Sequence, residues 1–387
     1  MGKRLVFVGG GHAHLTSLKN LSQFKKLGHQ VTLISSSPYH YYSGMGPGML
    51  SGIYHPWEVR FHVKRLAEDR GAAFIKGMVI RVDPLQHLLF LDSGEKVDYD
   101  VVSFNTGSGV PVETLTKASV DDQEGQEGLF PVKPVINLLK ARRTILEAFR
   151  NKKRLRFVVV GGGPAGIEIS ANLLRLLHEN RGEGEITLIG GRRLLVDGPD
   201  KVRRLVMESL SRRGVKIIEG SHVKTIERGQ VTLADGKRVD IDLAFMAIGI
   251  QPSPLFRDSR LPVGTDGGLL VNSHLQSVAH HDIFGGGDCI SLEGHPLAKV
   301  GVYAVRENPV LYHNLLAALE GEKMEVFTPQ KEFLLIFNMG NGKGIFWKKN
   351  WIWEGRLAFL LKDYIDRKFM RTFQVSGERD DHSEGVE

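Results

Sequence analysis

The chain repeats one pattern of apolar and polar positions twice. Residues 4–8 (RLVFV) are a short apolar run that predicts a buried parallel strand, followed by an amphipathic helical pattern to about residue 27 and a second apolar run at 30–34. The same order returns at 156–160 (RFVVV), with a helical pattern to about residue 177 and a strand at 185–189. Each half therefore predicts a strand–helix–strand unit of a parallel sheet.

Shorter strand-like runs follow each unit. They cover 73–80, 87–91 and 98–104 after the first unit, and 216–220, 230–233 and 244–247 after the second. Turn residues such as Asp235-Gly236 separate them. The two halves thus resemble each other beyond the first unit, which predicts two related domains.

A glycine-rich turn lies between strand and helix in the second unit. Gly161, Gly163 and Gly166 have the full GxGxxG spacing. The first glycine makes the tight turn, the second lets the backbone approach a pyrophosphate, and the third allows close packing of helix and strand. The phosphate lies at the helix N-terminus, where N–H groups and the macrodipole favour an anion. This turn predicts a dinucleotide site.

The corresponding turn of the first unit is imperfect. Gly9, Gly10 and Gly11 are followed by His12-Ala13-His14, so a histidine stands at the third glycine position. We expect the helix to pack farther from the strand there. The acidic ribose ligand of such sites is also absent, since the second strand is followed by Ser35, whose hydroxyl is a weaker acceptor. We still predict nucleotide binding here.

The second unit also lacks the ribose acid. Gly190-Gly191 and then Arg192 and Arg193 follow its second strand. An acid at this place binds the ribose diol and repels a 2′-phosphate, whereas nearby arginines do the reverse. The pattern mildly favours NADPH over NADH as the bound nucleotide. The alternative is that the two arginines simply face solvent.

These patterns predict an α/β fold with two Rossmann-like (three-layer ββα) dinucleotide-binding domains plus a small C-terminal α+β segment. We place one nucleotide-binding domain at 1–111 with 271–320 and the other at 129–270. Residues 321–375 form the C-terminal strand-and-helix segment, and 376–387 a disordered tail. The polar, acidic residues 112–128 read as a linker.

Composition narrows the chemistry. The 387 residues suffice for two domains, and 45 glycines indicate many tight turns or phosphate loops. The net charge of +7 suits nucleic acid, anionic cofactors or an anionic membrane surface. Basic clusters lack interleaved aromatic residues, so we expect no nucleic-acid partner. Cys289 is the only cysteine, so redox chemistry has to come from a bound cofactor.

Signals for export, membrane spanning and metal binding are missing. No run approaches ~18 consecutive apolar residues, and the first residues lack the apolar core of a secretory signal. We therefore expect a cytoplasmic protein. The 15 histidines show no metal-ligand spacing, so we expect no metal site.

Further motifs carry a family resemblance over nearly the whole chain. They are the first GGG, Thr106-Gly107, GGGPAGIE at 161–168, Ala247-Ile248-Gly249 before Pro252, and IFGGGD at 283–288. Together they resemble the FAD-dependent pyridine nucleotide oxidoreductases, and within them the type II NADH dehydrogenases. The segments GGGHAHL, GVYAVRE and KDYIDRKFM are more similar to the dehydrogenase-like domain found fused to selenophosphate synthetase.

The resemblance implies FAD in the first unit and NADH or NADPH in the second. Asp288 would accept a hydrogen bond from the FAD ribityl chain, residues 38–45 would run beside the isoalloxazine, and residues 299–304 would direct N–H groups at its pyrimidine end. Glu168, the catalytic candidate, would face the nicotinamide or a quinone, or would only stabilise its helix N-terminus. The predicted cofactor-binding residues are Gly9, Gly10, Gly11, His12, Ala13, Ser35, Ser43, Thr106, Gly107, Gly161, Gly163, Gly166, Arg192, Arg193, Gly249, Gly287, Asp288, Lys299 and Val300.

The single cysteine separates this chain from two groups within the resemblance. Disulfide reductases need a cysteine pair, and sulfide:quinone oxidoreductases use at least two cysteines near the flavin. Both activities are therefore excluded, and Cys289 is expected to be a buried, inert thiol.

The last apolar stripe indicates a surface helix. Leu357, Leu360, Leu361, Tyr364, Ile365, Phe369 and Phe373 share one helical face, with basic residues among the other positions. Such a helix, with Trp351 and Trp353, suits the interface of a membrane, as in type II dehydrogenases, where quinone enters. The alternative is a helix packed on the flavin domain or on a dimer partner. Residues 351–373 thus predict peripheral contact with the inner face of the cytoplasmic membrane.

The sequence therefore predicts an FAD-dependent NAD(P)H dehydrogenase that passes hydride to flavin and electrons to a quinone-like acceptor. Two alternatives stay open: a flavin-bearing redox sensor, and a soluble reductase of a protein or of a selenium or sulfur compound. A homodimer also stays open.

Overall fold

The computed structural model describes residues 2–112, 115, 128–227, 229–330 and 332–382. The expected linker at 112–128 and the last residues of the expected tail, 383–387, fall almost wholly outside this part of the chain.

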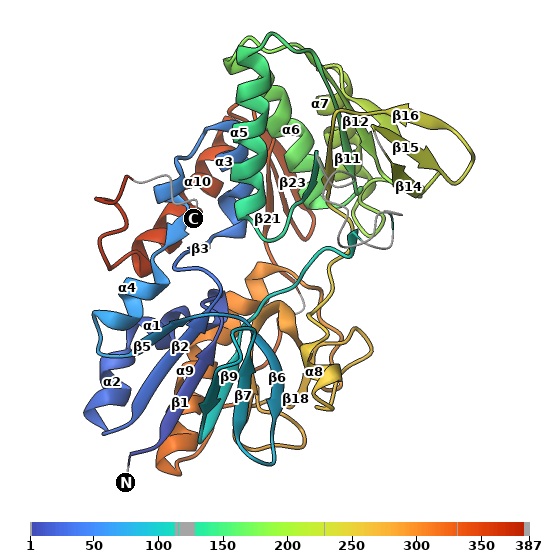
Figure 1. The fold of residues 1–387 in the computed structure, drawn as a ribbon. Coiled ribbons are helices and arrows are strands. Elements are labelled where there is room, and N and C mark those ends of the chain that lie inside the picture. The colour runs from blue at the N-terminus through green and yellow to red at the C-terminus, as the bar shows by residue number, and fades with distance from the viewer. Residues whose placement is uncertain (1, 113–114, 116–127, 228, 331, 383–387) are drawn as a thin grey trace.

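The first parallel sheet is built from both ends of the chain (Figure 1). Its order is β19-β9-β1-β2-β5, and Leu5 of the central strand is in register with Val31 on one side and Val101 on the other. The inner strands β1 and β9 are buried almost throughout, because helices cover both faces of the sheet there. Its strands are β1 (Arg4–Val8), β2 (Gln30–Ser35), β5 (Ala73–Lys76), β9 (Val101–Phe104) and β19 (Ile283–Gly285). Helices around it are η1 (His12–His14), α1 (Leu15–Lys19), α2 (Leu21–Lys26), α4 (Val63–Glu68) and α9 (Gly301–Glu320).

The second parallel sheet has the order β10-β17-β11-β12-β13. Leu155 of its central strand is in register with Gly184, as Arg4 is with Gln30 in the first sheet. Its strands are β10 (Leu129–Pro131), β11 (Leu155–Val160), β12 (Gly184–Ile189), β13 (Lys216–Ile218) and β17 (Leu243–Met246). The helices that belong to it are α5 (Ile136–Arg150), α6 (Pro164–Glu179) and α7 (Asp200–Ser211).

The same arginine–aspartate cluster stands at the start of each central strand. Arg4 lies 3.6 Å from Asp98 and 2.8 Å from Asp100. In the second half Arg156 lies 3.3 Å and 2.9 Å from the two aspartates at 240 and 242. The internal repeat seen in the sequence is therefore also a repeat of contacts.

Each half carries a small antiparallel sheet. The expected single run 73–80 is two strands, because β5 ends at Lys76 in the parallel sheet and the next strand begins after Gly77 in the antiparallel one. These sheets consist of β6 (Val79–Asp83), β7 (Leu88–Leu91) and β8 (Lys96–Asp98), and of β14 (Val223–Glu227), β15 (Gln230–Leu233) and β16 (Arg238–Asp240). The connecting elements are β3 (His40–Tyr41), η2 (Ser43–Met45), α3 (Gly46–Ser51), η3 (Pro56–Glu58), β4 (Arg60–Phe61), α8 (Leu255–Asp258), β18 (Leu269–Val271), η6 (Gly287–Cys289) and β20 (Ile290–Leu292).

The C-terminal segment is a three-stranded meander and a helix. They are β21 (Leu335–Asn338), β22 (Gly344–Lys348), β23 (Trp351–Gly355) and α10 (Arg356–Phe373). The helix begins at Arg356, because Trp353 still pairs with Phe346 in the sheet and the chain turns only at Gly355, with φ +145°. Figure 1 shows α10 beside α3 and between the two parallel sheets.

Residues 376–382 differ from the expected disordered tail. Gln374 donates to the Arg60 carbonyl at 2.9 Å, and Glu378, which is buried, accepts from the His62 N–H at 3.2 Å. Tyr39 donates to Asp381 at 3.2 Å. Polar composition suggested disorder, but these side chains find specific partners on the first domain's surface.

His14, at the third glycine position of the first turn, is accommodated by a buried site of its own. Its fully buried ring lies edge-on to Phe7, with Nδ1 2.6 Å from the Gly9 carbonyl and Nε2 2.8 Å from the Ser103 hydroxyl. The chain around it is a 3₁₀ turn, and the expected long helix is two short helices with a break at Asn20. The histidine thus fills the space that a close-packed helix would take.

We expect His14→Gly, which restores the ordinary glycine pattern, to lower the free energy of unfolding by about 2–4 kcal/mol. The variant loses two hydrogen bonds and leaves a cavity beside Phe7. Urea unfolding measures the loss, with Ser103→Ala as a control that should cost about 1 kcal/mol. An unchanged stability of the glycine variant would show that the helix closes onto the turn and that His14 is dispensable.

Candidate functional site

Both glycine turns touch the neighbouring strand end through backbone alone. A Cβ on Gly9, with φ +89°, would meet the Asn105 carbonyl oxygen at 2.2 Å, and one on Gly161, with φ +134°, would meet that of Ala247 at 2.1 Å. A Cβ on Gly166 would lie 1.9 Å from the Gly161 oxygen. By contrast, the Cβ position of Gly163, the N-cap of α6, has no described atom within 4 Å apart from its own chain neighbours. This open helix start fits a pyrophosphate.

Asn105 joins the first turn to the third glycine cluster. A Cβ on Gly11 would meet its Oδ1 at 1.6 Å, and its Nδ2 donates to the Gly286 carbonyl at 2.9 Å. Gly286 in turn lies against Ala13, with φ +75° at Gly287 next to it. Sequence reasoning missed Asn105, although its position directly before Thr106-Gly107 could have pointed to it.

Asp288 has a basic partner that the sequence did not reveal. Its Oδ2 accepts from the Lys133 ammonium group and, at 3.1 Å, from the Ser108 hydroxyl. Lys133 follows β10 of the second sheet, so this ion pair joins the two halves. Just before Ser108 in the chain, Thr106 is exposed and Gly107 has φ +70°.

The start of α9 lies beside the segment 38–45. Ser43 Oγ lies 3.5 Å from the Cβ position of Gly301, and Val300 caps the helix. Lys299 is held by Asp266 at 2.8 Å. Glu307, also missed by the sequence reasoning, accepts from the Gly287 N–H at 2.5 Å, and burial raises its pKa to about 7.

The second nucleotide site has one arginine engaged and one exposed. Arg193 donates to Asp200 at 2.8 Å, whereas the Arg192 side chain is exposed. The Cβ position of Gly162 lies 2.7 Å from the Gly190 oxygen, so residues 190–193 adjoin the glycine turn. Gly249, which follows β17, is exposed. In the first unit Ser35 ends β2, the strand that corresponds to β12 before Gly190.

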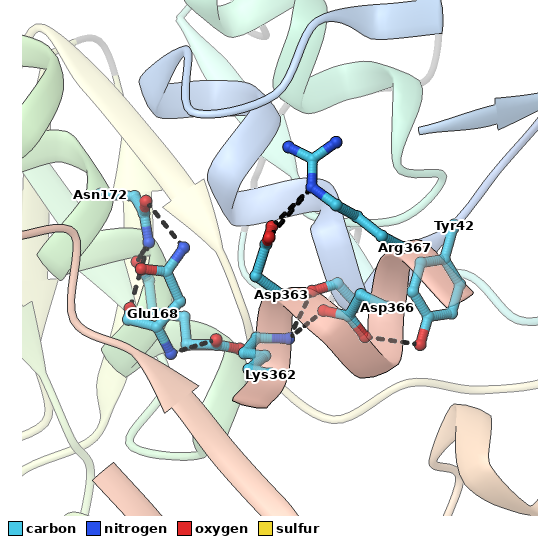
Figure 2. A network of polar contacts seen from close by, with 9 residues as sticks. Tyr42, Glu168, Asn172, Lys362, Asp363, Asp366 and Arg367 are labelled. Atoms are coloured by element: carbon cyan, nitrogen blue, oxygen red, sulfur yellow. Dashed lines mark hydrogen bonds and ion pairs between the residues drawn. The ribbon is translucent and has the colours of Figure 1, made fainter. Parts of the chain in front are cut away.

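Glu168 is held by the C-terminal meander (Figure 2). Its Oε1 accepts from the Asn338 N–H at 2.7 Å, while Asn172, one turn further along α6, donates to both the Glu168 and Asn338 carbonyls at 2.8 and 3.2 Å. Ser51 of α3 donates to Asn172 at 2.8 Å. The meander therefore holds the Glu168 carboxyl group, while Asn172, in contact with Ser51, is bonded to the Glu168 backbone carbonyl.

Lys362 and Asp366 form a buried ion pair on the inner face of α10. Lys362 Nζ lies 2.8 Å from Asp366 Oδ2 and donates to the Gly44 carbonyl at 2.8 Å. The other oxygen of Asp366 accepts from the Tyr42 hydroxyl at 3.0 Å. Figure 2 shows Glu168 and Tyr42 on opposite sides of this pair.

The charges of this network affect one another. The pKa of Glu168 is raised to about 6, chiefly by burial and to a smaller extent by Asp366, although Lys362 and the Asn338 N–H oppose the shift. Burial lowers the pKa of Lys362, but the carboxylates of Asp366 and Glu168 outweigh burial and leave it raised. Lys362 is therefore a cation, and Glu168 can exchange a proton close to neutral pH.

α10 has two faces, which corrects the expected single stripe. Ala358, Asp366, Met370 and Phe373 are buried, whereas Leu357 (72% exposed), Leu360 (57%), Leu361, Tyr364 (63%) and Ile365 face outward. Among the described residues no helix is both long and apolar enough to cross a bilayer, and no group of three or more His, Cys, Asp or Glu is placed to hold a metal.

Cys289 is fully buried, with its Sγ 3.3 Å from the Gly286 carbonyl. Burial raises the pKa of this thiol. A protonated, enclosed thiol is a poor nucleophile.

We expect Glu168→Gln to remove a pH dependence of stability. The folded carboxyl has a pKa of about 6 against an ordinary 4.5, so the folded protein binds the extra proton and its stability falls as pH rises through that window. The wild-type free energy of unfolding should drop, relative to the variant, by up to roughly 2 kcal/mol between pH 4.5 and 7. Urea unfolding at each pH measures this, with Glu179→Gln on the same helix as the exposed control. Parallel curves for wild type and E168Q would contradict the shift.

The comparisons with known proteins agree with this geometry. The family model for pyridine nucleotide-disulphide oxidoreductase matches residues 3–314. Ferroptosis suppressor protein 1 of Taeniopygia guttata is 26% identical, over 97% of this chain and 96% of its own. Demethylphylloquinone reductase NdbB of Synechocystis is 24% identical, over 74% and 71%.

Solved structures share the fold. NDH2 from Plasmodium falciparum superposes with a TM-score of 0.80 at 14% identity, covering all of both chains. The sulfide:quinone oxidoreductase from Aquifex aeolicus gives 0.78 at 19% identity, covering 97% of this chain and 92% of its own. The finer resemblance to the domain fused to selenophosphate synthetase finds no support among these relatives. The α/β fold with two parallel sheets is confirmed, and the chain belongs to the pyridine nucleotide-disulphide oxidoreductase family, as an FAD-dependent enzyme that uses NADH or NADPH.

Proposed function

We propose that this protein is an NAD(P)H:quinone oxidoreductase with FAD at the first glycine turn and the nicotinamide nucleotide at the second. The observation that carries the proposal is the position of Glu168 and Lys362, which lie together where the two nucleotide-binding halves and α10 meet. FAD supplies hydride acceptance from the nicotinamide and electron transfer onward. The predicted domain bounds, 1–111 with 271–320 and 129–270, remain part of this proposal.

The reaction NAD(P)H + H⁺ + quinone → NAD(P)⁺ + quinol takes up one proton from solvent. Glu168, with a pKa of about 6, can hold that proton and release it to an acceptor oxygen. Lys362, kept charged by Asp366, stabilises the negative charge that develops on that oxygen. A buried acid beside a buried cation therefore suits a carbonyl acceptor that becomes a hydroxyl.

The names of the curated relatives support a quinone. NdbB is a demethylphylloquinone reductase, and a 23% identical relative from Arabidopsis thaliana is an external alternative NAD(P)H-ubiquinone oxidoreductase. The disulfide chemistry of the wider family is not available to this chain, because Cys289 is its only cysteine.

NADPH is the donor that the second site suits better. Arg192 is exposed beside the glycine turn, and no acid stands at Gly190 to repel a 2′-phosphate. Arg193 is less available, since Asp200 already accepts from it.

The anaerobic titration of the purified holoprotein with each nucleotide tests the function. We expect NADPH to bleach the flavin absorbance, and to do so at lower concentration than NADH, because Arg192 adds a charge-assisted contact. Arg192→Ala should reduce this preference about five- to tenfold, while Arg204→Ala on α7 should leave it unchanged. A yellow protein that neither nucleotide reduces would overturn the dehydrogenase proposal, and reduction followed by no turnover with any quinone would leave another acceptor.

The outer face of α10 supports contact with a membrane surface, where quinones partition. Leu357, Leu360, Leu361, Tyr364 and Ile365 follow the spacing of one helical stripe, and all are exposed. Beside this stripe, a hollow is lined by Asp363, Tyr364, Arg367, Lys368, Arg371 and Thr372. Arg367 is paired with Asp363 and Glu58, but an apolar stripe beside Lys368 and Arg371 matches an anionic bilayer surface.

We expect the double variant Leu357→Glu with Leu360→Glu to lose at least about tenfold in binding to vesicles that contain phosphatidylglycerol, because two apolar side chains no longer enter the bilayer. Co-sedimentation measures binding. The matched control is Met78→Glu with Leu85→Glu, which alters equally exposed side chains at β6 and its turn. Equal losses in both variants would assign the effect to the added negative charge alone. Unchanged vesicle binding of the Leu357→Glu, Leu360→Glu variant would overturn the proposed membrane contact of α10.

A further inference from the structure

Two histidines meet inside the first domain at the place where its cofactor is expected. His12 follows the glycine turn and His40 lies in β3, and their Nδ1 and Nε2 atoms are 3.2 Å apart. The rings are edge to face, with centroids 4.6 Å apart. Both pKa values are lowered, chiefly by burial, that of His12 to about 4, so the pair is neutral at physiological pH.

One nitrogen of this pair has no partner within the described chain. His12 is 91% buried, since 9% of its surface is exposed, and its Nε2 makes no hydrogen bond. A buried polar atom without a partner destabilises the fold, because nothing replaces the hydrogen bond that the atom makes to water in the unfolded chain. Such an atom at the mouth of a nucleotide site indicates a contact that a bound group completes.

The surroundings of His12 identify which part of the cofactor it faces. Its ring centroid lies 5.3 Å from that of Tyr42 and 6.0 Å from that of Phe369, on which it stacks. Lys133, the partner of Asp288, is close enough to be the second cause, after burial, of the lowered pKa of His12. Tyr42 belongs to the segment at 38–45 and Lys133 to the Asp288 cluster, which are expected beside the flavin and the ribityl chain, whereas Phe369 lies on α10. The adenine end of the site is expected at Ser35 instead.

We propose that the His12 side chain donates a hydrogen bond from Nε2 to the flavin half of bound FAD, and that His40 fixes the tautomer that allows it. When His40 Nε2–H donates to His12 Nδ1, the single hydrogen of neutral His12 stays on Nε2. The opposite tautomer would present a lone pair. The flavin ring offers several acceptor atoms and the pyrophosphate only acceptors, so the donor form is complementary to them.

This inference rests on the proposed placement of FAD at the first glycine turn, and it is independent of the quinone and of the nucleotide preference proposed above. It also explains why histidines stand at positions 12 and 40, although the family resemblance requires only a glycine-rich backbone at this turn. The histidine at position 12 then adds a side-chain contact to a turn that lacks its third glycine.

The test follows FAD release from the full-length holoprotein on dilution, by flavin fluorescence, together with the visible flavin spectrum. His12→Phe keeps the aromatic packing but removes the donor, and we expect about a tenfold weaker FAD affinity and a shifted spectrum. His12→Gln restores an N–H donor and should stay within about threefold of wild type. His29→Phe is the matched control, since His29 is buried but is paired with Glu320 away from this cluster.

The pair itself is tested by a double-mutant cycle. His40→Phe should weaken FAD binding less than His12→Phe does, because His12 can still adopt the donor tautomer unaided. The double variant should bind FAD as His12→Phe does, since His40 acts only through His12. Thermal unfolding of each holoprotein checks that it is folded. An unaltered FAD affinity and spectrum in His12→Phe would overturn the proposal, and strictly additive losses in the cycle would overturn the role of His40.

Discussion

The structure depends on a backbone contact that occurs once in each half. The turn after each central strand lies directly against the end of the next strand, Gly9 on Asn105 and Gly161 on Ala247, with no room for a Cβ. Because both turns are pulled in, the helix that follows starts at the carboxyl edge of its sheet and directs its N–H groups outward. The two nucleotide-binding edges, and everything that packs between them, inherit their position from these contacts.

Buried charges then tie the C-terminal segment to those edges. Glu168 comes from the second half, Tyr42 from the first, and Lys362 and Asp366 from α10, yet they share one network. Buried ion pairs add little net stability, because desolvation offsets attraction. Their geometry is nevertheless demanding, since each carboxyl needs its own donor. The network therefore contributes mainly by positioning a cation and a titratable acid, and only little by stabilising the fold.

The repeated apolar patterns predicted both parallel sheets because buried strands and glycine turns leave strong local signals. Contacts between distant segments left none. Lys133 reads as an ordinary surface lysine in the sequence, and only the fold brings it to Asp288. His14 looked like a steric fault, since the sequence does not show that Ser103 and the Gly9 carbonyl await its ring. The polar residues 376–382 suggested disorder because composition cannot reveal partners such as His62.

The two faces of α10 connect the proposed site to its surroundings. The inner face holds Lys362 against Gly44, and residues one or two positions away on the outer face, Leu360 and Leu361, are exposed. One helix thus separates a buried cation from an apolar surface by its own thickness, about 10 Å. If the outer face lies in a bilayer, as proposed, an apolar acceptor reaches the cation from the membrane without crossing water. Because each residue turns the helix by about 100°, the periodicity of α10 that exposes the apolar stripe also directs Lys362 to the inner face.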